Sequence, residues 1–226
     1  MKTKSLLAAF AAVVLTTIAT AQTAAPAEAA ALHRQSIERL QQKNTKEAVE
    51  FAEQATKADP TKAEYFSQLG MALGQRMGEI GFMQQAMMSG KLKKAFEQSV
   101  ALDPQHVAGL IGLARYYTNA PEIAGGSLVK AAEYATRVQQ LNPFLGELER
   151  ANIANKDEQY AEALAHYEVA TKLKPDHAGG QFGCGRMLAK LGRKDEARAR
   201  FEAALKLNPN FEAAKKALAE LDQPAG

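Results

Sequence analysis

Small and apolar residues recur along most of the chain at the three- and four-residue spacing of one α-helix face. The clearest stretch covers residues 178–211, where these positions are Gly185, Leu188, Ala197, Phe201 and Ala204. Residues three or four positions apart lie on the same side of a helix, so the pattern predicts amphipathic helices that bury one side. The sequence therefore predicts an all-α protein.

A short sequence motif that ends in proline recurs at the predicted helix ends. The prolines of its five copies are Pro60, Pro104, Pro143, Pro175 and Pro209, and successive ones are 44, 39, 32 and 34 residues apart. Proline is tolerated at a helix end because its missing N–H would have no partner there. A period near 34 residues, lengthened twice, indicates repeated pairs of helices.

This spacing resembles the tetratricopeptide repeat (TPR). In the last repeat Gly185 would let the two helices approach closely, while Phe201 would fill the space between them. The resemblance implies a right-handed α-solenoid of about five helix-turn-helix repeats, with a concave groove and a C-terminal capping helix. The repeats, cap and tail are expected at residues 29–62, 63–106, 107–143, 144–177, 178–211, 212–222 and 223–226. An ordinary helical bundle with coincidental prolines is the alternative.

Residues 1–21 have the pattern of a secretory signal. Lys2 and Lys4 form a basic end, Leu6–Leu15 is apolar, and small residues precede Gln22. An uncleaved membrane anchor is the alternative, although a bilayer requires a longer run of about 20 apolar residues. We expect a spacer at residues 22–28, an exported protein of bacterial type, and a periplasmic location, with full secretion as the other possibility.

Two repeats are longer than 34 residues, with the extra residues expected in the turn between their two helices. These insertions are Met77–Gly90 in the second repeat and Asn119–Ser127 in the third, where Ser127 is placed to cap a helix starting at Leu128. The pair is similar to insertions in a subset of exported bacterial TPR proteins. Insertions on one edge of a solenoid often carry function, and neutral loop growth is the alternative.

The longer insertion contains a candidate edge patch of methionines. Its members are Met77, Met83, Met87 and Met88. Thioether side chains adapt to irregular apolar partners, which favours a protein contact, and they are also soft ligands suited to Cu(I). Plain packing inside the repeat is the third interpretation.

Composition and charge narrow the classes of function. The chain of 226 residues is 46% apolar and 23% charged, as in a globular protein. Its net charge of +3 comes from 28 basic and 25 acidic residues, and two of the basic residues, Lys2 and Lys4, lie in the expected leader. This balance does not favour a nucleic-acid partner.

Apart from the methionines, nothing in the sequence points to catalysis, a metal or another cofactor. The single cysteine, Cys184, falls on an inward position of its helix, so a buried inert thiol is expected. The four histidines form no pair at i, i+4 spacing. The stretch Gly179–Gly185 superficially resembles a phosphate-binding loop, but it belongs to a predicted helix and does not follow a strand. We expect a protein that is not an enzyme.

Binding through the concave groove is therefore the expected activity. The repeat phase predicts six groove residues, namely Tyr116, Tyr117, Asn152, Lys156, Arg186 and Lys190. Their amide and cationic side chains would hydrogen-bond a peptide carboxylate or acidic side chains, whereas a solvated helix face is the alternative. We expect a protein-binding adaptor or assembly factor of the cell envelope. The rival functions are a self-associating scaffold that uses the edge insertions and metal handling by the methionines, and the oligomeric state stays open.

Overall fold

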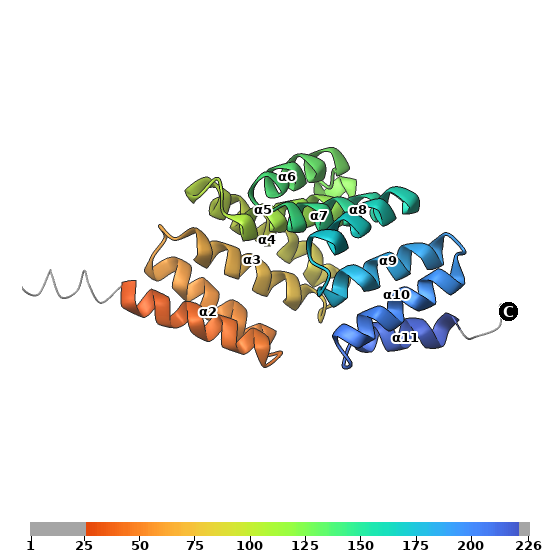
Figure 1. Ribbon diagram of the computed structural model, residues 1–226. Helices are drawn as coiled ribbons and strands as arrows, with labels where there is room; N and C mark the ends of the chain where they lie inside the picture. The colour runs from red at the N-terminus through yellow and green to blue at the C-terminus, as the bar shows by residue number, and fades with distance from the viewer. Residues whose placement is uncertain (1–25, 222–226) are drawn as a thin grey trace, which may run out of the picture. The chain divides into compact units, whose positions relative to one another are not determined.

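A computed structural model describes residues 26–221, in which all regular elements are helices (Figure 1). The all-α prediction is confirmed, while the expected leader (1–21) and tail (223–226) lie outside the described residues. The chain divides between Gly109 and Leu110 into two compact units, which we call the N-terminal and the C-terminal unit. In the part of the chain that the structure describes, no helix combines the length and apolar character needed to cross a membrane.

The N-terminal unit consists of successive helix pairs. Its helices are a segment at residues 26–41, α2 (Thr45–Ala58), α3 (Ala63–Met77) and α4 (Phe82–Leu102). α3 packs against both α2 and α4. One buried hydrogen-bond network links these helices, since the Ser36 hydroxyl donates to the Ala48 carbonyl at 2.9 Å and accepts from the Gln68 amide at 2.9 Å.

The C-terminal unit continues the same pattern. The division falls inside α5 (Val107–Asn119), most of which belongs to this unit. Its other elements are the 3₁₀-helix η1 (Glu122–Ala124), α6 (Leu128–Leu141), α7 (Pro143–Lys156), α8 (Tyr160–Leu173), α9 (Ala178–Lys190), α10 (Lys194–Leu207) and α11 (Glu212–Leu221). From α6 to α11 each helix packs against the next one in the chain. The core includes Tyr167, Cys184, Met187 and Phe201, and it is flanked by Leu218 of the last helix.

Close helix approach occurs where the sequence places glycine. A Cβ atom on Gly185 would lie 2.5 Å from the ring of Phe201, which is only 1% exposed. In the N-terminal unit a Cβ atom on Gly70 would lie 2.6 Å from the ring of Phe96. The predicted role of Gly185 as a close-packing position is confirmed, because any larger side chain would push the two helices apart.

The insertion in the second repeat is mainly helix, whereas the sequence suggested a lengthened turn. α4 has 21 residues, and α2, α6, α8 and α10 have 14 each. Only Gly78–Gly81 separate α3 from α4. The segment that follows Gly81 contains good helix formers, and Gly90 alone does not end the helix. The extra length therefore extends α4 at its N-terminal end by about two turns.

The insertion in the third repeat is an ordered turn, as predicted. Gly125 has a φ of 85°, a left-handed conformation that glycine adopts without strain. A Cβ atom on Gly126 would lie 1.9 Å from the Ala120 carbonyl oxygen. The Ser127 hydroxyl oxygen accepts a hydrogen bond from the Lys130 N–H at 3.3 Å, which confirms Ser127 as the cap of α6.

Candidate functional site

The C-terminal unit repeats one local pattern on α5, α7 and α9. In each helix a buried small residue is followed directly by a polar residue that is exposed or half-buried. The pairs are Ala114–Arg115, Ala151–Asn152 and Gly185–Arg186. Because residues three and four positions further along a helix share a face, Thr118 and Asn119 lie with Arg115, and Asn155 and Lys156 lie with Asn152.

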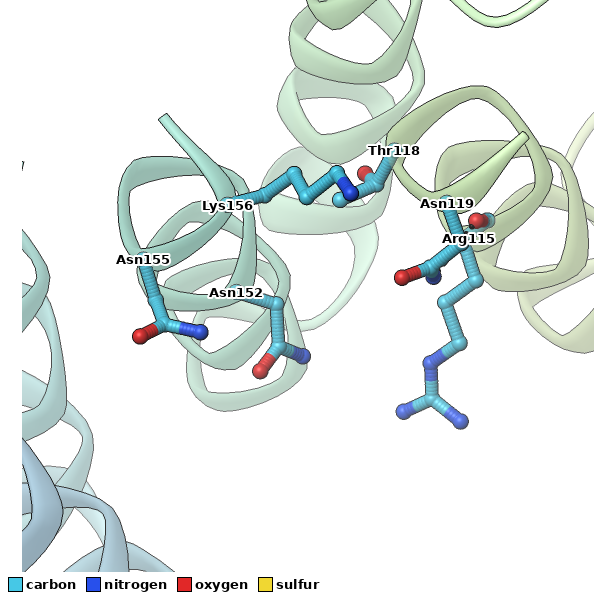
Figure 2. Close-up of a pocket in the computed structure, with 6 residues that line it drawn as sticks. All are labelled: Arg115, Thr118, Asn119, Asn152, Asn155 and Lys156. Atoms are coloured by element: carbon cyan, nitrogen blue, oxygen red, sulfur yellow. Dashed lines mark hydrogen bonds between the residues drawn. The ribbon is translucent and has the colours of Figure 1, made fainter. Parts of the chain in front are cut away.

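These α5 and α7 side chains line one surface cavity, which we call the amide cavity. Its volume is about 260 Å³, and all six lining residues are polar. They are Arg115, Thr118 and Asn119 from α5, and Asn152, Asn155 and Lys156 from α7 (Figure 2). In Figure 2 the Lys156 side chain extends from α7 toward α5. The cavity thus offers amide groups and two cations to a ligand.

Arg115 is held in place by a buried carboxylate. Its Nε donates to the two Glu149 oxygens at 2.9 and 3.2 Å, and its Nη2 donates to Glu149 Oε1 at 2.7 Å. The Glu149 side chain is 3% exposed, whereas that of Arg115 is 59% exposed. This bidentate geometry occupies one edge of the guanidinium group. Since a guanidinium has five N–H groups, three stay free for a ligand as far as the described residues are concerned.

Asn152 is also fixed by a core side chain. Its Oδ1 accepts a hydrogen bond from the Tyr167 hydroxyl at 2.9 Å, which leaves the amide NH₂ as a donor. Burial raises the pKa of Tyr167, and the nearby positive charge of Arg186 opposes that rise. The hydroxyl therefore stays protonated as the donor to Asn152 at neutral pH, so the orientation of this amide is set before any ligand binds.

The other lining residues differ in whether their polar groups already have hydrogen-bond or ion-pair partners. The Thr118 hydroxyl and the Asn119 amide donate to main-chain carbonyls of α5, both at 2.8 Å. Lys156 is exposed and makes no ion pair within residues 26–221. Of the three charged groups here, Arg115 and Lys156 are positive and Glu149 is negative, so the cavity carries one net positive charge.

Four of the six predicted groove residues do not line this cavity, and two of these four, Tyr116 and Tyr117, are buried. Tyr116 and Tyr117 are 8% and 6% exposed. The Tyr116 hydroxyl donates to the Ala124 carbonyl at 2.5 Å, and the Tyr117 ring stacks on that of Tyr134 at 5.7 Å. Both tyrosines thus contact residues of the segment that follows α5 and are buried inside the protein. The prediction that they line the groove is wrong.

Arg186 and Lys190 lie on α9, outside the amide cavity but in the same phase of their repeat. Both are exposed. The Arg186 guanidinium lies 5.9 Å from the Phe182 ring centre, and Lys190 Nζ lies 5.7 Å from that of Tyr160. Such cation–π contacts orient the two side chains and leave them accessible.

Arg115, Thr118 and Asn119 were not predicted from the sequence. The insertion that follows α5 lies between this helix and Pro143. If repeat positions on α5 are numbered backwards from Pro143, the extra residues therefore shift every position by the length of the insertion. The buried Ala114 provides the correct reference, since Arg115 follows it as Asn152 follows Ala151. In the third repeat, the buried Ala114 is therefore the residue from which the other repeat positions should be numbered.

Other reactive groups in the unit have structural partners. Cys184 is fully buried, as predicted, and burial raises the pKa of its thiol to about 11. His166 Nδ1 lies 2.7 Å from a Glu147 carboxylate oxygen, so this histidine has an acidic partner on the neighbouring helix. Among the described residues, no group of three or more His, Cys, Asp or Glu could hold a metal ion.

The four edge methionines are placed differently. Met83 and Met87 are 75% and 81% exposed. Met77 and Met88 are half-buried. The predicted patch is thus accessible mainly through the two residues that lie on the extension of α4.

Family comparisons identify the repeat. Two tetratricopeptide repeat models match residues 29–62 and 154–221. The chain is a TPR protein. The matched segments hold the first repeat and the last part of the chain, where the spacing of small residues is most regular. A search of curated proteins returns no match.

Solved structures show the same fold. A thermophilic TPR protein of Thermus thermophilus matches with a TM-score of 0.71 and 18% identity, over 85% of this chain and 98% of that one. The APC/C hetero-tetramer Cut9–Hcn1 matches with a TM-score of 0.67 and 17% identity, over 87% of this chain and 36% of that one. A MamA protein matches with a TM-score of 0.52 and 16% identity, over 88% of this chain and 98% of that one. These likenesses establish an all-α TPR solenoid.

Proposed function

We propose that this TPR protein is a non-catalytic adaptor or assembly factor of the bacterial cell envelope, whose C-terminal unit binds an extended segment of a partner protein. TPR solenoids are modules of protein–protein interaction and present concave surfaces for binding. The observation that carries the proposal is the amide cavity, in which side chains fixed by Glu149 and Tyr167 face solvent.

The side chains of the cavity suit a peptide with acidic residues. Amide groups such as those of Asn152 and Asn155 can pair with main-chain N–H and C=O groups of an extended segment. Arg115 and Lys156 would bind carboxylates, and the fixed guanidinium offers paired donors that match a carboxylate. Because Arg115 and Asn152 are already ordered, little conformational entropy is lost when a ligand binds.

The envelope location rests on the pattern of residues 1–21, which lie outside the described residues. Mass spectrometry of the N-terminus of the protein recovered from the periplasmic fraction tests it. A mature chain beginning at Gln22 supports export, whereas an intact leader on a cytoplasmic chain contradicts it.

Crosslinking capture from intact cells tests the binding site. Lys156→Glu should lose the partner because it reverses a charge in the cavity. Lys216→Glu, which makes the same charge change at a side chain 81% exposed on α11, should retain it. Circular dichroism should show equal helicity for both variants. Equal capture by both variants would reject the amide cavity as the binding site.

Two further arms extend the test. The double variant Arg186→Glu with Lys190→Glu shows whether the bound segment also reaches α9. With purified protein, a peptide rich in Asp and Glu should bind the Lys156→Glu variant at least about tenfold more weakly than the native chain, and the difference should shrink at high salt.

A further inference from the structure

The extension of α4 leaves an apolar surface in the N-terminal unit. Phe82, Met83 and Met87 are 81%, 75% and 81% exposed. Met83 and Met87 are four residues apart, so their side chains lie on one side of the helix. We call these three residues the α4 ridge. Large apolar side chains exposed within one short segment indicate a contact with another molecule.

A shallow apolar groove adjoins the ridge. Its volume is about 380 Å³, and α2, α3 and α4 all contribute to it. It is lined by Val49, Glu53, Leu73, Arg76, Ile80, Gln84, Met87, Met88 and Lys91. Leu73 in its floor is 1% exposed. Met87 belongs both to the ridge and to the groove lining, so the two form one continuous surface, which we call the methionine face.

The charges beside this face are paired with one another. Lys91 forms an ion pair with Glu53. Arg76 Nη1 lies 3.0 Å from Glu79 Oε2, which also accepts a hydrogen bond from the Thr45 hydroxyl at 2.5 Å. These two cations and two carboxylates leave no net charge. The face therefore attracts neither an acidic nor a basic partner in particular, and two copies of it would not repel each other.

The ridge is fixed in position. The Gln85 side-chain amide donates to the Met77 carbonyl at 3.0 Å and to the Ile80 carbonyl at 2.9 Å. These bonds connect the first turn of α4 to the end of α3 and to the intervening turn. A ridge held in this way has less entropy to lose on binding than a free loop.

We propose that the methionine face binds a second copy of this chain. A two-fold axis brings the same surface of both copies together, so each α4 ridge can enter the groove of the other copy. Both halves of such a contact, a protruding ridge and an adjoining groove, are present on one surface with balanced charges. The flexible thioethers of Met83 and Met87 can adapt to the groove walls. This contact shares no residue with the amide cavity.

Light scattering over a concentration series tests the proposal. The native chain should approach twice the monomer mass as its concentration rises. Met83→Gln with Met87→Gln keeps good helix formers at exposed positions and should raise the dimer dissociation constant about 100-fold or more, because four apolar side chains leave the interface. Met83→Glu with Met87→Glu should give the same loss.

Ile123→Glu is the matched control. Ile123 is 99% exposed on the insertion of the third repeat, so this change also replaces an exposed apolar side chain. The Ile123 variant should dimerise like the native chain. A native chain that stays monomeric throughout, or methionine variants that dimerise normally, would overturn the proposal. A monomeric chain that binds a different protein through Met83 and Met87 would also overturn it.

Discussion

Replacing Arg115 by alanine should destabilise the protein far more than loss of an ordinary surface ion pair. The change removes a guanidinium that is 59% exposed, but it leaves the Glu149 carboxylate, 3% exposed, without its partner. An exposed ion pair contributes about 0–1 kcal/mol, whereas removing one partner of a buried pair costs about 3–5 kcal/mol. Water can enter the space that Arg115 leaves, so we expect a cost of about 2 kcal/mol.

Chemical and thermal unfolding followed by circular dichroism would measure this cost. About 2 kcal/mol corresponds to a fall in Tm of about 4–8 °C for a chain of this size. Glu149→Gln should cost less, because the remaining guanidinium faces water. In the Arg115→Ala background Glu149→Gln should restore stability, since it removes the unpaired charge. If Arg115→Ala costs less than about 0.5 kcal/mol and Glu149→Gln restores nothing, the buried carboxylate does not hold Arg115 as argued.

Three further predictions test the packing. Gly185→Ala should lower the free energy of unfolding by about 1–3 kcal/mol, because its Cβ would lie 2.5 Å from the buried Phe201 ring, as denaturant titration would show. Gly90→Ala, where an added Cβ meets nothing within 4 Å in α4, should instead stabilise the chain by about 0.5–1 kcal/mol in the same titration. Cys184, with a pKa of about 11, should react with a thiol reagent at pH 8 only as fast as the chain unfolds, and rapid labelling of the native protein would contradict this.

The helix pairs could be predicted from the sequence because close packing leaves few choices. At Gly185 the neighbouring Phe201 ring excludes a side chain, and the spacing between the two residues recurs with the repeat. The course of the longer insertion could not be predicted in the same way. Its methionines and glycines suit either a turn or a helix, and the hydrogen bonds of Gln85 to the Met77 and Ile80 carbonyls depend on tertiary structure.

The candidate site was predicted in part, because its residues lie where packing imposes little constraint. Asn152 and Lys156 were found, since α7 belongs to a repeat of regular length. The insertion after α5 displaces the repeat phase of that helix, so the sequence favours Tyr116 and Tyr117 over Arg115. The bond from Tyr167 to Asn152 joins residues 15 positions apart on two helices, and periodicity alone does not indicate it.

The same helix positions carry different chemistry in the two units, which supports the proposed binding site in the C-terminal unit. After the close-packing Gly70, the corresponding residues of α3 are Met71, Gly74 and Gln75, all exposed and uncharged. In the C-terminal unit those positions hold the cations and amides of the amide cavity, one of them tied to a buried carboxylate. Packing needs only the small residue, so a buried Glu149 brings a desolvation cost that folding does not require. A cost of this kind is expected where a side chain must be held ready for a ligand, and it points to Arg115 as the residue whose loss should matter most for binding.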